Sequence, residues 1–418
     1  MAKYNPFKPG SIVSPGMFVG RLEEVQQLTR ILGQIKHGNP QHFLIHGERG
    51  IGKSSLLFYL RVLAEGHIQS LEKENFDFIT LETELEPDTT YSQLIQKIAI
   101  QLRKKVEDLQ KLKDYAKAVW DFITRWEVLG VKYNNPLKPI QPHEMLDELA
   151  ESFVSLSQSI RGKLDGALIL VDEADKPPHN ANLGEFLKLL SEKLTKKDAT
   201  NIGIGLSGIS TITKKLKRSH ESSLRVLQMF ALQPLLPSER IQVIERALTE
   251  GKEKNGFETT ISEDAKNWIG AYSQGYPHFI QQFGYSAFDH DTDNAIDIAD
   301  VISGAIDENG AFAQLGTKYF HDLYFDKIAS DEYRQVLRAM AVHFDDWITK
   351  KQLQAEAKVK AHTLNNAITV LKKRNIIIPQ EGKAGVYRLP SRAFAVWINA
   401  FTEQITKTEE AKKASESS

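Results

Sequence analysis

The residues with the clearest chemical pattern lie between Gly47 and Ser54, which read Gly-Glu-Arg-Gly-Ile-Gly-Lys-Ser. They match the phosphate-binding pattern G-x-x-x-x-G-K-[ST] at every fixed position. Residues 41–46 before them are typical of a short buried strand, and residues 55–63 after them begin an apolar helix. Glycines let such a loop turn its amide groups inward, and the helix start adds partial positive charge. The segment therefore predicts a site for a nucleoside triphosphate.

Two side chains of this loop have expected roles. The ammonium group of Lys53 can reach the β- and γ-phosphates, and the hydroxyl of Ser54 can take a coordination position of Mg²⁺. The residues of this segment expected to contact the nucleotide are Gly47, Glu48, Arg49, Gly50, Ile51, Gly52, Lys53, Ser54 and Ser55.

A pair of acids gives the site its expected chemistry. Four apolar residues, 168–171, are followed by Asp172 and Glu173. Because the carboxyl ends of parallel strands face the ligand crevice, we expect Asp172 to hold Mg²⁺ through water and Glu173 to act as general base. Ser207, after the strand 202–206, either contacts the γ-phosphate or the attacking water, or simply begins the next turn. Asp175 caps or pairs locally.

Composition limits the classes of protein to consider. The chain has 418 residues, which suits two or three domains, with 41% hydrophobic and 26% charged residues. A formal net charge of −1 excludes attraction of the whole molecule to nucleic acid, so such binding needs a local patch. The absence of cysteine excludes disulfides and thiolate metal sites. With no signal-peptide pattern and no apolar run of membrane-spanning length, we expect a cytoplasmic protein without a membrane partner.

Apolar strands at 167–171 and 202–206, separated by helices, predict an α/β fold with a parallel sheet buried on both faces. Residues 289–300 loosely follow calcium-loop spacing, but Asn294 replaces the required glycine, so we expect a solvated loop that caps a helix at Asp297. Other expected elements are an extended arm at 1–16, helices at 22–35 and 90–112, a strand at 76–81, an irregular insertion at 120–142, mainly helical structure at 236–330, and a disordered tail at 406–418.

Together these motifs resemble the AAA+/STAND class of P-loop ATPases, in particular the archaeal-type ATPases related to origin-recognition initiators. The resemblance covers about residues 17–300 and includes two later pieces, Leu232-Gln233-Pro234-Leu235 and Gly275-Tyr276-Pro277. It implies a P-loop NTPase domain over 17–235, with the sheet sandwiched by helices, and a helical lid over 236–330. It also implies that the cofactors are ATP and Mg²⁺.

The resemblance also implies roles for single residues. Phe18, Val19, Gly20 and Arg21 would form the pocket for adenine, Ser207 would be the sensor-1 residue, and Pro277 would belong to the lid turn. His278 stands where relatives usually have an arginine, which favours a switch with slow hydrolysis and puts a sensor-2 role in question. An arginine finger from a neighbouring subunit would be Arg225 or Arg218. Alternatively, Arg218 belongs with Lys214, Lys215 and Lys217 to an exposed basic helix end.

The last segment has a different pattern. Apolar helical spacing from Tyr333 to Met340, a capping box at 349–352, a helix at 362–374 and strands at 376–379 and 386–389 predict a winged-helix domain over 331–405. Between 331 and 392, twelve Lys and Arg face six Asp and Glu, a surplus of six positive charges. Duplex DNA could therefore bind through 349–392, with Thr363, Asn365 and Asn366 at base edges and Lys383 at the backbone.

Winged helices also serve as protein-docking or autoinhibitory elements, and residues 372–374 can complement a helix C-terminus. Three functions therefore stay open. The first is an ATPase acting as a nucleotide-controlled conformational and oligomerisation switch, which forms a homo-oligomer in its ATP state. The second is an ATP-regulated DNA-binding protein, similar to initiators or transposition regulators. The third is a subunit that recruits an effector protein, as in antiphage defence.

Overall fold

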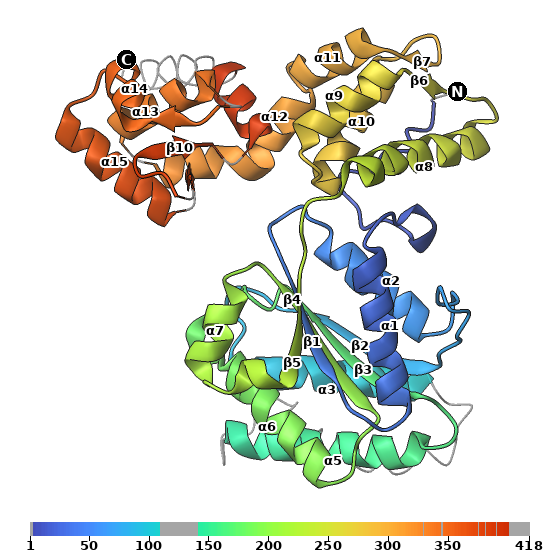
Figure 1. Cartoon of the computed structure of the whole chain (residues 1–418). Helices are drawn as coiled ribbons and strands as arrows, with labels where there is room; N and C mark the ends of the chain where they lie inside the picture. The colour runs from blue at the N-terminus through green and yellow to red at the C-terminus, as the bar shows by residue number, and fades with distance from the viewer. Residues whose placement is uncertain are drawn as a thin grey trace, which may run out of the picture. The chain divides into compact units, whose positions relative to one another are not determined.

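The computed structural model describes residues 3–108, 141–328, 330–343, 346–374, 376–380, 382–389 and 391–400. Most of the expected insertion at 120–142 and the whole expected tail at 406–418 lie outside the described residues. The chain divides into two compact units: Ile12–Gln233 forms one, and Met1–Ser11 with Pro234–Ser418 forms the other (Figure 1). The N-terminal arm therefore belongs in part to the unit that contains the C-terminal half.

The Ile12–Gln233 unit is built on a parallel sheet of five strands, as the sequence predicts. The order is β2-β3-β4-β1-β5. Residues 167–171 of β3 have no solvent exposure, which explains why this strand is apolar throughout instead of alternating. The strands are β1 (His42–His46), β2 (Phe78–Glu84), β3 (Gly166–Asp172), β4 (Ile202–Gly208) and β5 (Leu227–Ala231).

Helices flank this sheet on both faces (Figure 1). Side chains of α3, α5 and α6 share one apolar core with strand residues such as Leu44, Ile169 and Ile204. The helix predicted at 22–35 is α1 (Leu22–Lys36), although Leu22 itself is exposed and lies off the apolar face. The other helices are α2 (Lys53–Ala64), α3 (Tyr91–Asp108), α5 (Pro142–Ile160), α6 (Leu183–Lys196) and α7 (Ile212–Ser219), with 3₁₀ turns at Pro15–Met17, His179–Ala181 and Ser223–Val226.

The second unit begins with the predicted helical region. Asp297 caps α11, because its carboxylate accepts hydrogen bonds from the amides of Ala299 and Asp300, as the sequence predicts. Two π-helical turns, Gly316–Phe320 and Asp322–Asp326, follow the last α-helix of this region. The α-helices are α8 (Pro237–Asn255), α9 (Glu263–Ser273), α10 (Pro277–His290), α11 (Ile298–Ile306) and α12 (Ala311–Leu315), with short strands β6 (Thr260–Ile261) and β7 (Ala295–Ile296).

The winged helix is confirmed. Its small antiparallel sheet has the order β8-β10-β9, and Thr349 forms the predicted capping box with Gln352. The lid and winged helix share a core, because Trp397 packs against Phe320 at 5.9 Å between ring centroids. The elements are α13 (Asp331–Val342), β8 (Ile348–Thr349), α14 (Lys350–Glu356), α15 (Ala361–Lys373), β9 (Ile378–Pro379) and β10 (Val386–Arg388), followed by helical residues 392–400.

Among the helices that the structure describes, none combines the length and the apolar character that a membrane crossing requires.

Candidate nucleotide site

The phosphate loop occupies residues 47–52, between the end of β1 and the start of α2. Gly50 and Gly52 have φ angles of 75° and 98°, in the left-handed region that residues with a side chain adopt only with strain. A Cβ atom at Gly47 would lie 3.1 Å from the carbonyl oxygen of Leu232. Backbone geometry therefore favours glycine at positions 50 and 52, and a close approach of the chain after β5 favours it at position 47.

Lys53 lies against this loop. Its ammonium group donates hydrogen bonds to the carbonyl oxygens of Gly47 at 3.2 Å and Glu48 at 2.9 Å. Burial lowers the pKa of Lys53, while the carboxylates of Glu173 and Asp172 oppose that change. The two strand-end acids therefore lie near enough to act on the charge of the loop lysine.

The two acids differ in conformation. Asp172 is the last residue of β3, whereas Glu173 has a left-handed φ of 53°. The amide of Glu173 donates a hydrogen bond to the Asp172 carboxylate at 2.8 Å. Burial raises the pKa of Glu173, and the charge of Lys176 opposes this. A carboxylate with raised pKa is a stronger base, and strained backbone often marks functional residues.

Ser207 lies on β4, between the strand of Asp172 and the strand that leads into the phosphate loop. Its register partner on β1 is Ile45. The Ser207 hydroxyl has no solvent exposure and finds no hydrogen-bond partner in the described part of the chain. Because an unpaired buried hydroxyl is costly, this position needs an explanation beyond folding.

Asp175 has the local structural role that was expected of it. Its carboxylate accepts a hydrogen bond from the amide of Ile209 at 2.8 Å, which joins the loop after β3 to the loop after β4. Lys215 donates hydrogen bonds to the carbonyl oxygens of Asp175 and Pro177. Lys215 is thus half-buried and engaged, while Lys214, Lys217 and Arg218 on the same helix are exposed.

The segment expected to receive adenine lies beside the loop. The guanidinium of Arg21 is buried and donates a hydrogen bond to the carbonyl oxygen of Ile51 at 3.1 Å. Phe18 packs against Tyr59 of α2, with ring centroids 5.0 Å apart. Residues 18–21, which include Val19 and Gly20, are therefore held by the phosphate loop and the helix that follows it.

Arg225 lies at the amino ends of the strands, opposite the end where the phosphate loop lies. Together with His42 and Lys188 it lines a groove of about 620 Å³ at the amino ends of β1 and β5. The phosphate loop follows the carboxyl end of β1. Arg225 is thus separated from its own loop by the length of the sheet, so a role at the phosphates would require a neighbouring subunit.

Pro277 and His278 belong to the other unit. Gly275 has a left-handed φ of 80°, and α10 begins at Pro277, as expected of the lid turn. The His278 ring lies 5.3 Å from that of Tyr319. Burial, together with Lys318, lowers the pKa of His278 to about 4. His278 is therefore neutral at pH 7 and brings no positive charge to the lid turn.

The sequence analysis missed two residues near the acids. The ammonium group of Lys176 lies 3.0 Å from the Glu84 carboxylate and 3.9 Å from that of Glu173. Glu84 ends β2 and has Asp172 as its register partner on β3. No local pattern indicates that these strands are neighbours, so the sequence alone offers no signal for this contact.

The winged helix carries a second candidate surface. Lys350, Lys372 and Lys373 line a groove of about 510 Å³ with Asn365 and Thr369, and none of its described lining residues is acidic. Such a surface suits an anionic partner. Lys383 is exposed in the turn between β9 and β10.

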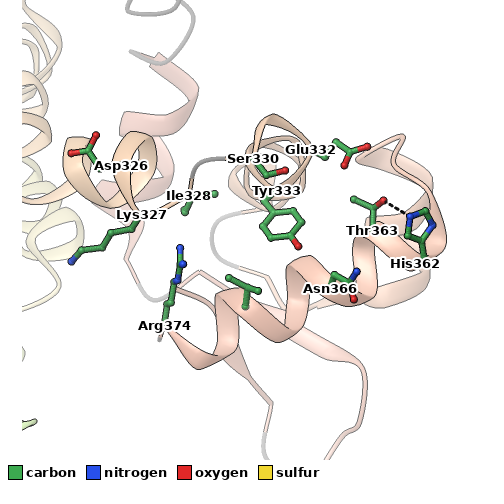
Figure 2. Close-up of a pocket in the computed structure, with 11 residues that line it drawn as sticks. Asp326, Lys327, Ile328, Ser330, Glu332, Tyr333, His362, Thr363, Asn366 and Arg374 are labelled. Atoms are coloured by element: carbon green, nitrogen blue, oxygen red, sulfur yellow. Dashed lines mark hydrogen bonds between the residues drawn. The ribbon is translucent and has the colours of Figure 1, made fainter.

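The other flank of α15 has a different character. Figure 2 shows Tyr333 of α13 facing Asn366 of α15, and Arg374 directly after that helix, across a cavity of about 450 Å³. Asn365 and Asn366 thus lie on different flanks of the helix. The prediction that Thr363 reads base edges does not agree with the structure, because this residue is only 6% exposed.

Comparisons with known proteins agree with this arrangement. Residues 17–196 match the family model described as AAA ATPase domain. A stretch of 68 residues is 41% identical to an uncharacterised HTH-type transcriptional regulator of Methanocaldococcus jannaschii, but the match covers 16% of this chain and 17% of that protein.

Two solved structures match nearly the whole chain. The ORC2 protein of Aeropyrum pernix, as ADPNP-ADP complexes, is similar with a TM-score of 0.52 and 13% identity, over 96% of this chain and 98% of that one. The ORC1 protein of the same organism in complex with DNA has a TM-score of 0.41 and 16% identity, over 92% and 93%. Identities this low concern the fold alone. Over residues 17–196, the chain is an AAA ATPase domain.

Proposed function

We propose that this protein is a Mg²⁺-dependent ATPase whose nucleotide state controls its conformation and its association with further copies. The observation that carries the proposal is the placement of Lys53 at the start of α2 and of Asp172 and Glu173 at the carboxyl end of β3, with Ser207 on β4, the strand between β3 and β1. The AAA ATPase match over 17–196 and the nucleotide complexes of the similar ORC2 structure support it.

The residues present fit the magnesium ion that this chemistry needs. The described residues contain no cluster of three or more His, Cys, Asp or Glu that could enclose a metal. Mg²⁺ is commonly bound by one or two protein oxygens, water and the phosphates themselves. The Ser54 hydroxyl and the Asp172 carboxylate supply such oxygens. When bound, the ion would neutralise charge developing on the phosphates.

The chain's own groups then have distinct roles. The amides of residues 47–55 bind the phosphates, and Lys53 exchanges its carbonyl partners for phosphate oxygens. Glu173 accepts the proton of the attacking water, and the unpaired Ser207 hydroxyl orients that water or the γ-phosphate. Residues 18–21 receive the adenine. Pro277 and a neutral His278 belong to the lid, and Arg225 or Arg218 reaches the site of a neighbouring subunit.

The experiment is a comparison of Glu173→Gln with the parent chain in ATP binding and hydrolysis. The variant should bind Mg²⁺-ATP with similar affinity yet hydrolyse it about 10²–10⁴-fold more slowly, the range for loss of a general base. Glu253→Gln, an exposed change in α8, is the matched control and should keep full activity. Equal turnover in all three proteins would refute the assignment. Particle mass with and without a slowly hydrolysed analogue tests the association.

A second function is favoured by the basic groove on the winged helix. We propose that residues 349–392 contact duplex DNA and that nucleotide regulates this contact. Lys350, Lys372 and Lys373 line one groove with Asn365, and the relative matched over 68 residues carries the name of an HTH-type regulator. The groove's charge suits a phosphate backbone, and Asn365 can reach a base edge.

The test is DNA affinity as a function of salt after Lys350, Lys372 and Lys373 are changed to Gln. Each lost phosphate contact should reduce the slope of log K against log salt by about 0.9. The same change at Lys97, Lys252 and Lys254, which lie on the other helices α3 and α8, removes equal charge and should keep the slope. If the parent binds no duplex at low salt, the winged helix is instead a docking element for an effector protein.

A further inference from the structure

Residues 3–8 are packed against the lid helices, although the whole ATPase domain separates them in sequence. Phe7 is only 2% exposed. A Cβ atom at Gly284, in the middle of α10, would lie 2.3 Å from the Phe7 ring. A Cβ atom at Gly251 in α8 would lie 3.0 Å from Pro6. Glycine lowers the stability of a helix interior relative to alanine. Both helices therefore carry a destabilising residue at the position that contacts the arm.

Polar contacts hold the same segment. Asn255 bonds to both backbone groups of Tyr4, at 2.8 Å to the amide and 3.0 Å to the carbonyl. One carboxylate oxygen of Glu250 accepts hydrogen bonds from the Tyr4 hydroxyl at 2.8 Å and the Lys8 ammonium at 2.6 Å. Lys3 forms an ion pair with Asp291. Residues 3–8 of the arm are therefore packed into this unit and held there by specific polar contacts.

This docking gives the two units two covalent connections. The chain passes from one unit to the other between Ser11 and Ile12, and returns between Gln233 and Pro234. A body attached through one flexible point can rotate about three axes, whereas a body attached through two points can rotate only about the line that joins them. The docked arm thus adds a second covalent restraint on relative motion of the units.

The first connection also leads directly to the nucleotide site. The segment that begins at Ile12 reaches Phe18, which packs on α2, and Arg21, whose guanidinium bonds to Ile51 of the phosphate loop. We propose that the N-terminal arm is a second tether that transmits nucleotide occupancy to the lid and winged-helix unit. This inference rests on the proposed function, because it concerns the regulation exerted by the same nucleotide site.

The experiment cuts the tether without removing the arm. A recognition sequence for a site-specific protease is inserted between Ser11 and Ile12, both of which are exposed. Hydrogen exchange of α8, α10 and α15 is measured with and without Mg²⁺ and a slowly hydrolysed ATP analogue, before and after cleavage. Calorimetry measures analogue binding in each state, and the uncut insertion protein is compared with the parent chain.

Before cleavage, the analogue should slow exchange in α8 and α10. After cleavage, we expect analogue affinity within about threefold of the uncut value. The exchange response should fall by at least about half, because nucleotide binding no longer changes the local stability of this unit. An undiminished response after cleavage would overturn the tether. If the uncut protein binds no analogue, the proposed function fails. If it binds analogue without any exchange response, only the inference fails.

A substitution gives a second route to the same result. Gly284→Ala leaves every arm residue intact but places a methyl group where the Phe7 ring lies. It should reduce the exchange response as cleavage does. Gly270→Ala in α9 is the matched control, because its nearest neighbour would be a flexible Arg240 side-chain atom at 3.8 Å. A full response in Gly284→Ala would also contradict the proposal.

Discussion

The ammonium group of Lys176 lies 3.9 Å from the carboxylate of Glu173, three residues earlier in the chain. Lys176 also bonds to Glu84 at the end of the neighbouring strand β2, at 3.0 Å. The proposed general base therefore has a positive charge beside it, and that charge is positioned by a second acid.

Removing this charge should change the pH dependence of hydrolysis. Burial raises the pKa of Glu173, and the positive charge of Lys176 opposes that rise. Lys176→Met removes the opposing charge, so the pKa of Glu173 should rise further. A base acts only when deprotonated, so the acid limb of the profile of kcat/KM against pH should move to higher pH. Lys254→Met, which removes an exposed charge on α8, should leave the limb in place. An unchanged limb in Lys176→Met would show that the lysine does not act on this carboxylate.

His42 should make the ATPase unit sensitive to mild acid. Burial lowers its pKa from 6.5 to about 4, and its Nδ1 accepts the amide hydrogen of Ile204 at 3.2 Å. Because the folded pKa is below the unfolded one, the stabilisation is complete above pH 6.5 and is lost progressively as pH falls toward 4. The shift corresponds to a loss of about 3 kcal/mol in the free energy of unfolding.

The measurement is hydrogen exchange of the β1 and β4 amides from pH 6.5 to 4, corrected for intrinsic rates. His42→Asn keeps an acceptor two bonds from Cβ and does not titrate. It should be less stable overall at pH 7 but should show a shallower decline of protection with acid. A parallel decline in parent and variant would mean that His42 is not the titrating group.

Arg21 should be required for a rigid phosphate loop. Arg21→Ala leaves the buried carbonyl of Ile51 without its guanidinium partner, which costs about 1–3 kcal/mol. If this cost falls on the nucleotide-bound form of the loop, a loss of 1.4 kcal/mol corresponds to about tenfold weaker ATP binding. Calorimetry with Mg²⁺ and an ATP analogue measures it. Arg30→Ala, an exposed change on α1, should bind as the parent does, and equal affinity of both variants would remove Arg21 from the site.

Phe7 and Gly284 should couple energetically. Phe7→Ala removes a buried ring and should cost about 3–5 kcal/mol in the stability of the lid unit. In the double variant with Gly284→Ala, the methyl group finds the space that the ring has left, so the combined loss should be smaller than the sum by at least about 1 kcal/mol. Exchange protection of the α10 amides measures the stability of the parent, of the two single variants and of the double variant. Strict additivity would show that the ring and the glycine do not compete for space.

The nucleotide chemistry could be predicted because its signals are local. The phosphate loop needs glycines, a lysine and a hydroxyl within eight consecutive residues, and the strand 168–171 places Asp172 and Glu173 at its end whatever its neighbours are. The winged helix was equally predictable, since its helical period, capping box and paired strands follow one another along the chain. Short-range geometry determines these features, so a single segment carries the information.

The tertiary structure alone decided which distant residues meet. Strand order placed Ser207 between the two functional strands and Glu84 beside Lys176, and the packing of α15 buried Thr363 while exposing Asn365. The arm was recognisable as extended, but only the structure showed Phe7 inserted beside Gly284. Such contacts depend on how whole elements pack. Gly284 accommodates a ring 277 positions away, but in the sequence it looks like any other glycine in a helix.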